Sequence, residues 1–166
     1  MSTFVALDFE TANHSRNSAC ALGLVLCRDG RIARSKQFLI RPPTRKFFFS
    51  YIHGIEWNDV ARAPHFGELW PAIEPHLAEA EFLVAHNAPF DRGVLRACCD
   101  TYGVTMPALD FRCTVRIARH QWNLYPTRLP DVCRHLQIPL QHHDAGSDAE
   151  ACARIVLAAI DAGWTP

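Results

Sequence analysis

Two carboxylates follow an apolar run near the start of the chain, and their spacing suits the binding of a cation. The run Thr3–Leu7 is continuous and too short for a helix, so it predicts a buried strand that stops at Asp8. Asp8 and Glu10 are separated by one residue, which places both side chains on the same face of a strand. Like charges held together are unfavourable unless a cation neutralises them, and carboxylate oxygens suit Mg²⁺ or Mn²⁺. The alternative is an acidic pair that is only solvated charge at a strand end.

A third acidic residue follows a second buried strand. The apolar run Phe82–Ala85 predicts that strand, and the polar segment His86–Asp91 comes directly after it. In open α/β sheets, functional groups gather at the C-terminal ends of neighbouring parallel strands. Asp91 is therefore expected to meet Asp8 and Glu10 if the two strands are parallel neighbours. The alternative is that Asp91 only interacts with the dipole of a helix that begins there.

A histidine and an aspartate lie in the polar segment His142–Ala151, which leads into an apolar C-terminal helix. A histidine with an ordinary pKa near 6.5 can remove a proton from an activated water at neutral pH. His143 fits that role, and Asp148, five residues later, can anchor the metal. Helix capping by Asp144 or Ser147 would explain those two residues but not the histidine.

The rest of the pattern predicts the scaffold that positions these residues. The apolar run Ser18–Cys27 and the loosely alternating segment Arg31–Ile40 are joined at an Asp-Gly turn and predict a hairpin, so the first three strands are expected to form an antiparallel meander. Residues 44–64 have no clear period and read as an unusually apolar loop. Helices are expected over residues 66–80, after the strand Phe82–Ala85 to about residue 102, and over residues 112–122, 129–136 and 147–162. The fold class is thus α/β, with a mixed central sheet flanked by helices.

Composition limits the class of protein. The 166 residues are 49% hydrophobic and 20% charged, which fits a single domain spanning residues 1–166. No apolar run reaches the roughly 18 residues of a membrane span, and the N-terminus does not read as a signal segment. The seven cysteines form no C-x-x-C pair and read as reduced thiols. We therefore expect a cytoplasmic protein without a membrane partner.

The net charge is zero, but the charges occur in blocks. Residues 28–46 carry seven basic side chains against one acid, residues 56–91 carry seven acids against one arginine, and residues 92–134 carry seven arginines against three aspartates. Such blocks permit a polyanionic partner without requiring one.

The three segments that carry these acidic residues and the histidine resemble the motifs of the DEDD superfamily of 3′-5′ exonucleases. The match is to its histidine branch (DEDDh, DnaQ-like), which includes the proofreading ε subunit of bacterial replicative DNA polymerase. The Asp-x-Glu-Thr motif appears as Asp8–Thr11, the second motif as His86–Asp91, and His-x-Ala-x-x-Asp as His143–Asp148. The segment His53–Ile55 is similar to the family's His-Gly-Ile. The match covers nearly the whole chain in the family's order.

This resemblance implies a ribonuclease H-like fold and hydrolysis of phosphodiester bonds from the 3′ end of DNA, releasing nucleoside 5′-monophosphates. It also implies two divalent metal ions, Mg²⁺ or Mn²⁺, as cofactors. Asp8, Glu10 and Asp148 would hold the first metal, Asp8 would bridge to the second, and Asp91 would support the second directly or through water. His143 would be the general base. The implied catalytic set is Asp8, Glu10, Asp91, His143 and Asp148.

The resemblance also implies substrate contacts. The backbone at Thr11 and Ala12 would contact the terminal nucleotide, and Ile55 with Phe90 would pack on bases near the 3′ end with little sequence specificity. His142 is at the wrong spacing to be the base. Further substrate-binding candidates from the motifs are His53, His86 and Asn87. Candidates for a phosphate track are Arg112, Arg116, Arg119 and Arg128.

The expected partner is the 3′ end of DNA, single-stranded or frayed, in preference to RNA. Because the chain ends at Pro166 without the C-terminal extension of the ε subunit and without a clamp-binding peptide, a stand-alone trimming or repair nuclease is expected, with no polymerase or clamp association evident. The sequence does not indicate an oligomeric state. The nearest alternative is a 3′-5′ exoribonuclease or oligoribonuclease in RNA processing. A non-catalytic nucleic-acid-binding scaffold is a third reading, opposed by the presence of all four carboxylates and the histidine.

Overall fold

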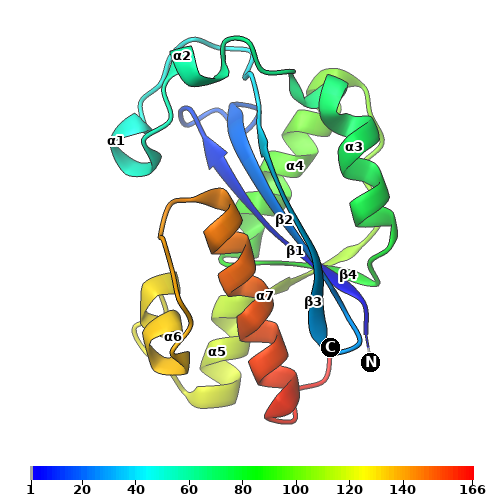
Figure 1. Cartoon of the computed structure of the whole chain (residues 1–166), viewed down its shortest axis with the longest axis vertical. Coiled ribbons are helices and arrows are strands. Elements are labelled where there is room, and N and C mark those ends of the chain that lie inside the picture. The colour runs from blue at the N-terminus through cyan, green and yellow to red at the C-terminus, as the bar shows by residue number, and fades with distance from the viewer. Residues whose placement is uncertain (1) are drawn as a thin grey trace.

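A five-stranded mixed sheet runs through the molecule, which the computed structural model describes from residue 2 to residue 166 (Figure 1). The strand order is β3-β2-β1-β4-β5. The first three strands pair antiparallel, whereas β4 pairs parallel with both β1 and β5. The predicted meander and mixed sheet are therefore confirmed. The strands are β1 (Phe4–Thr11), β2 (Ala19–Arg28), β3 (Arg31–Leu39), β4 (Phe82–Ala85) and β5 (Asp110–Cys113).

Helices cover both faces of the sheet and enclose one apolar core on each side (Figure 1). The helices α3 (Phe66–Ala78) and α4 (Ala88–Tyr102) pack on one face. The other face is covered by α5 (Thr114–Trp122), α6 (Leu129–Leu136) and α7 (Ala145–Asp161). The segment expected to be a loop contains two short helices, α1 (Ser50–His53) and α2 (Trp57–Val60).

Alternation along β1 directs its carboxylates toward α7. Residues 5, 7 and 9 enter the core under α3 and α4, whereas Phe4 and Ala6 enter the core under α7. Asp8 and Glu10 continue the second series, since side chains two residues apart share a face. The expectation that the strand stops at Asp8 is wrong, because β1 remains paired with β2 through Asp8, Glu10 and beyond. Both carboxylates are therefore held by a ladder of backbone hydrogen bonds.

Two element boundaries differ from the sequence prediction. Residues 112 and 113 are not helical, because β5 pairs with β4 from Asp110 to Cys113 and α5 begins only after it. At the other boundary, α7 begins at Ala145, two residues earlier than expected. Its start is capped by Asp144, whose Oδ1 accepts a 2.8 Å hydrogen bond from the backbone N–H of Ser147.

A close approach at Gly23 brings the start of α7 onto the sheet. Gly23 lies in β2 directly opposite Asp8. A Cβ atom at Gly23 would lie 2.5 Å from the carbonyl carbon of Ala145 and 2.9 Å from the backbone N of Gly146. Glycine is the residue that permits this contact. The first turn of α7, which carries Asp148, therefore sits against the strand next to Asp8.

The described residues contain no disulfide bond and no candidate membrane-spanning helix. All seven cysteines are free, and six of them are buried. Within residues 2–166, no helix has the length and apolar character needed to cross a membrane.

Candidate active site

Carboxylates from three elements converge beside the end of β1. Asp8 and Glu10 come from β1 and Asp148 from the first turn of α7, and each offers an oxygen within 4.8 Å of the others. Asp91, in the first turn of α4, accepts a 3.0 Å hydrogen bond from the backbone N–H of Phe9. The structure thus brings together all four of the acidic residues singled out in the sequence.

Desolvation and mutual repulsion of the carboxyl groups define the electrostatics of this cluster. Burial, together with Asp91, Asp148 and Glu10, raises the pKa of Asp8 well above its ordinary value. Burial is also the largest reason that the pKa of Glu10 rises to about 8 and the pKa of Asp91 to about 7. Within residues 2–166, no lysine or arginine forms a salt bridge with any of the four carboxylates. An all-oxygen set of this kind fits hard divalent cations such as Mg²⁺ or Mn²⁺.

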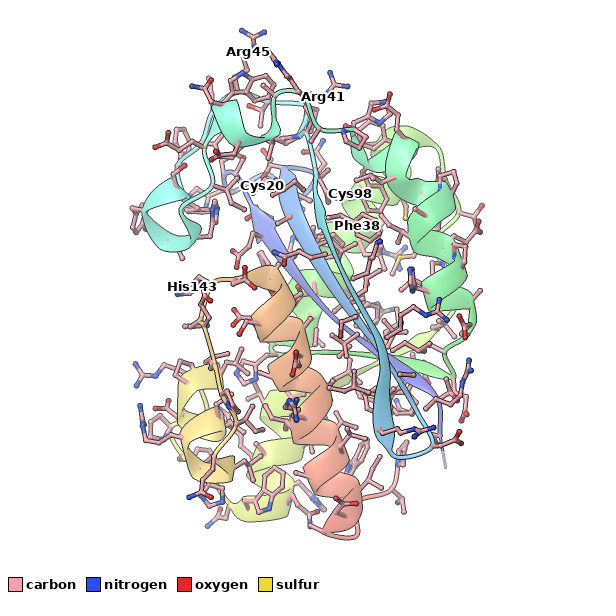
Figure 2. All side chains as sticks on the ribbon, in the orientation of Figure 1. Cys20, Phe38, Arg41, Arg45, Cys98 and His143 are labelled. Atoms are coloured by element: carbon pink, nitrogen blue, oxygen red, sulfur yellow. The ribbon has the colours of Figure 1, made fainter. Side chains whose placement is uncertain are left out.

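Two adjacent histidines reach the same carboxylate in different ways. Nδ1 of His142 donates to Oδ2 of Asp148 at 3.1 Å, and the backbone N–H of His143 donates to the same oxygen at 3.0 Å. His143 has a φ of 68°, and the two rings stack with centroids 3.7 Å apart. Figure 2 shows His143 on the loop that precedes α7. The ring of His143 is therefore not committed to Asp148, whereas the ring of His142 is.

The protonation state of His143 suits a base at neutral pH. Burial and the neighbouring His142 lower the pKa of His143 below its ordinary value of 6.5. A neutral imidazole is the form that accepts a proton. The assignment of His143 as the base stays a prediction.

His53 ties α1 to the end of β1. Its Nδ1 accepts a 3.1 Å hydrogen bond from the backbone N–H of Ile55, so Nε2 carries the proton and donates to the carbonyl of Thr11 at 3.0 Å. Ala12 is also engaged, because its N–H donates to Ser18 and its carbonyl accepts from residues 48 and 49. Fewer backbone groups are thus free for a nucleotide than the sequence suggested, and the contacts of Thr11, Ala12 and Ile55 with substrate stay predictions.

His86 and Asn87 differ in their freedom to contact a ligand. Nε2 of His86 donates to the carbonyl of Thr127 at 3.0 Å, and Nδ1 accepts from the hydroxyl of Thr114 at 2.8 Å. Burial lowers the pKa of His86 to about 4, so the ring stays neutral and binds β4 to the start of α5. Asn87, by contrast, is exposed and its side chain makes no capping hydrogen bond. Substrate contact by Asn87 stays a prediction. His86 links β4 to the loop and helix that follow β5, a structural role that its motif did not predict.

Phe90, the residue before Asp91 in α4, contacts Arg16 at the surface. Phe90 is 38% exposed, and the guanidinium carbon of Arg16 lies 6.0 Å from its ring centroid. Arg16 also donates to the carbonyl of Phe90 at 3.3 Å. Sequence reasoning missed Arg16, since only the folded chain brings it to α4.

A model of the RNase T exonuclease family matches residues 5–156. The chain belongs to this exonuclease family. Exodeoxyribonuclease 10 of Escherichia coli strain K12 is 33% identical over 150 residues, which cover 82% of this chain and 60% of that protein. A PolC-type DNA polymerase III of Clostridium perfringens is 31% identical over 160 residues, covering 92% of this chain and 11% of the polymerase. The exonuclease chain therefore spans less than two thirds of the length of either relative.

Solved structures share the fold of this exonuclease over almost its whole length. A complex of exonuclease X with 5′-overhanging duplex DNA superposes with a TM-score of 0.80 and 24% identity, covering 98% of this chain and 94% of that one. The nuclease domain of 3′hExo, a DEDDh family member bound to rAMP, superposes with a TM-score of 0.82 and 17% identity, covering 98% and 93%. The expected ribonuclease H-like architecture is confirmed, and the family match confirms the resemblance to exonucleases.

Proposed function

We propose that this chain is a metal-dependent 3′-5′ exonuclease that removes nucleoside 5′-monophosphates from single-stranded or frayed 3′ ends of DNA. The observation that carries the proposal is the largely buried cluster of Asp8, Glu10, Asp91 and Asp148, to which no lysine or arginine within residues 2–166 is paired, in a member of the exonuclease family. A cluster of this kind is unfavourable unless cations occupy it. It therefore suits a site that binds both metal and a phosphodiester.

Asp8, Glu10 and Asp148 would hold one divalent cation, and Asp91 would support a second next to Asp8. When bound, the cations would supply Lewis-acid activation of the attacking water and stabilise negative charge on the leaving 3′ oxygen. The imidazole of His143 accepts the proton that the water loses as it attacks phosphorus. The bond from phosphorus to the 3′ oxygen then breaks with its electron pair staying on that oxygen, which takes a proton from solvent. The products are a strand one nucleotide shorter with a 3′-hydroxyl and a nucleoside 5′-monophosphate.

The other residues near the cluster orient the reacting groups. His142 holds the carboxylate of Asp148 through the 3.1 Å hydrogen bond from Nδ1, so we assign it the positioning of this side chain, and we assign the base to His143, whose contact with Asp148 is made by its backbone N–H. The backbone N–H of Phe9 does the same for Asp91 at 3.0 Å. Phe90 offers an exposed aromatic face to a base near the 3′ end, which suits contact without sequence preference.

DNA is the proposed substrate because the relatives at 33% and 31% identity carry the names exodeoxyribonuclease and DNA polymerase. The test is the digestion of matched DNA and RNA oligonucleotides, labelled at the 3′ or the 5′ end, with Mg²⁺ or Mn²⁺. We expect 3′-labelled DNA to release labelled mononucleotide at once, and 5′-labelled DNA to shorten stepwise. A strong preference for RNA would contradict the DNA assignment, and no cleavage of either would contradict the nuclease and favour a scaffold.

A further inference from the structure

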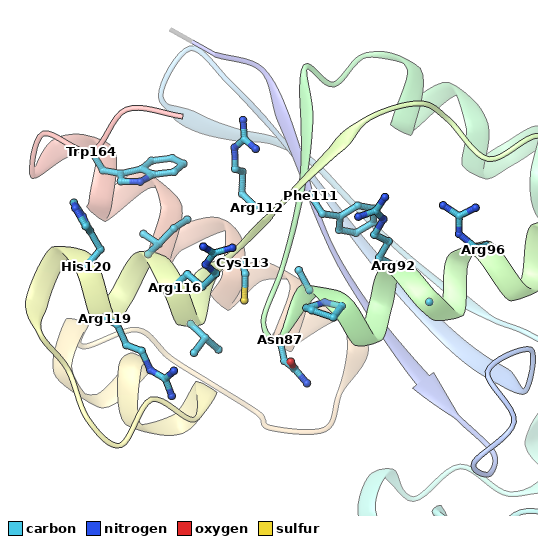
Figure 3. Close-up of a pocket in the computed structure, with 15 residues that line it drawn as sticks. Asn87, Arg92, Arg96, Phe111, Arg112, Cys113, Arg116, Arg119, His120 and Trp164 are labelled. Atoms are coloured by element: carbon cyan, nitrogen blue, oxygen red, sulfur yellow. The ribbon is translucent and has the colours of Figure 1, made fainter.

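A cleft separate from the carboxylate cluster lies between α4, β5 and α5. It has a volume of about 880 Å³, and its floor includes Phe111 and Cys113 from β5, with Trp164 at one end (Figure 3). Basic side chains from all three elements surround it. They are Arg92 and Arg96 from α4, Arg112 from β5, and Arg116 and Arg119 from α5.

The positive charge of the cleft is almost entirely uncompensated. Among residues 2–166, four of its five arginines form no salt bridge with a carboxylate. Arg112 alone has an acidic neighbour, Asp110, at 3.7 Å, and the Asp110 side chain is 80% exposed. An exposed ion pair of this kind contributes little. The cleft thus gathers like charges that an anion would stabilise.

The cleft shares a wall with a groove that reaches the catalytic residues. This second groove has a volume of about 800 Å³ and is lined by His142 and His143. Asn87, Val115 and Arg119 line both hollows. Asn87 and Arg119 therefore offer polar contacts where a chain that leaves the carboxylate cluster past His143 would enter the arginine cleft.

We propose that the arginine cleft binds the sugar-phosphate backbone of the substrate strand at nucleotides distant from the bond that is cleaved. The inference rests on the proposed function and extends it, since the four carboxylates require only the terminal nucleotides. Figure 3 shows the arginines spread along both walls of the cleft, not converging on one point. One phosphate group would need convergent donors, whereas a row of phosphates matches a row of guanidinium groups.

Length-dependent affinity is the consequence. Each phosphate neutralised on a single strand adds about 0.7 to the slope of log affinity against log salt concentration. Removing two arginines should therefore lower that slope by about 1.4, and it should weaken binding of a long strand roughly 10- to 30-fold near 0.1 M salt. A strand too short to reach the cleft should be unaffected.

The experiment measures binding of 5′-fluorescein single-stranded DNA of about 4 and about 16 nucleotides by anisotropy, in chelator so that cleavage cannot occur. The test variant is Arg96→Gln with Arg116→Gln, both exposed positions on facing helices. Arg31→Gln with Lys36→Gln removes the same charge from β3, at the opposite edge of the sheet. Thermal melting checks that both variants fold.

We expect the test variant to lose affinity and salt slope for the longer strand only, while the control variant binds both strands as the wild type does. The proposal is overturned if the test variant keeps the wild-type affinity and slope, or if the control variant loses as much. Equal losses for both strand lengths would also overturn it, because they would indicate a site for one nucleotide. Binding in chelator does not depend on cleavage, so absence of nuclease activity would contradict the proposed function and leave this result readable.

Discussion

Replacing Gly23 by alanine tests whether the close approach of α7 to the sheet positions Asp148. The added Cβ would lie 2.5 Å from the carbonyl carbon of Ala145. Carbon atoms in ordinary contact are about 3.5 Å apart, so the start of α7 must move by about 1 Å. A displacement of that size in a catalytic group can cost about 100-fold in rate. Overpacking adds about 1–3 kcal/mol of destabilisation, or roughly 2–12 °C in melting temperature.

The assay is the initial rate of oligonucleotide cleavage with Mn²⁺, well below the melting temperature of each protein. Ile73→Ala is the matched control, because Ile73 is fully buried in α3 on the opposite face of the sheet. That substitution should cost about 2–5 kcal/mol and leave the carboxylates in place. We expect Gly23→Ala to lose far more rate than Ile73→Ala. A folded Gly23→Ala protein with wild-type turnover would refute the reasoning.

Three further outcomes follow from the site. In metal-free protein, the pKa values of Glu10 (about 8) and Asp91 (about 7) are raised, so between about pH 4 and pH 8 the folded state holds protons that the unfolded state releases. The free energy of unfolding should therefore fall by a few kcal/mol as the pH rises through that range. Melting curves should show this decline and its suppression by Mg²⁺; a flat profile would contradict the raised pKa values. His143→Ala should reduce turnover at least about 100-fold with little loss of stability, since its backbone N–H still reaches Asp148. His142→Ala should reduce turnover less than His143→Ala does, because it removes only the hydrogen bond that orients Asp148. A larger loss of steady-state turnover in His142→Ala than in His143→Ala would overturn the assignment of His143 as the base.

The chemistry-bearing residues could be predicted from the sequence where a local period decides the geometry. Alternation along a strand puts Asp8 and Glu10 on one face whatever the rest of the chain does. Asp91 converges on them because β1 and β4 are parallel neighbours, which the sequence allowed but did not require. The strand β5 was missed because its four residues lie at the edge of the sheet and are half-buried or exposed, so they carry no alternating pattern.

Contacts made by tertiary structure were beyond local reasoning. The left-handed backbone at His143 directs its N–H, and not its ring, toward Asp148. The ring of His142 makes the hydrogen bond to Asp148, which the spacing of the motif did not predict. The arginine cleft is similar, since α4 and α5 are separate helices whose basic sides face each other only after folding. Residue spacing therefore predicted the carboxylates of the site more readily than the hydrogen-bonding groups that orient them.

Whether the carboxylate cluster is the catalytic centre is tested by comparing wild type and Asp8→Asn on a 5′-labelled DNA oligonucleotide, with Mn²⁺ and with excess chelator. Asn keeps the size of the side chain and removes one charge from the cluster. We expect the wild type to shorten the strand stepwise from the 3′ end with metal only, and Asp8→Asn to leave the strand intact. Cleavage by Asp8→Asn at the wild-type rate, or by the wild type in chelator, would contradict a catalytic centre built on these carboxylates.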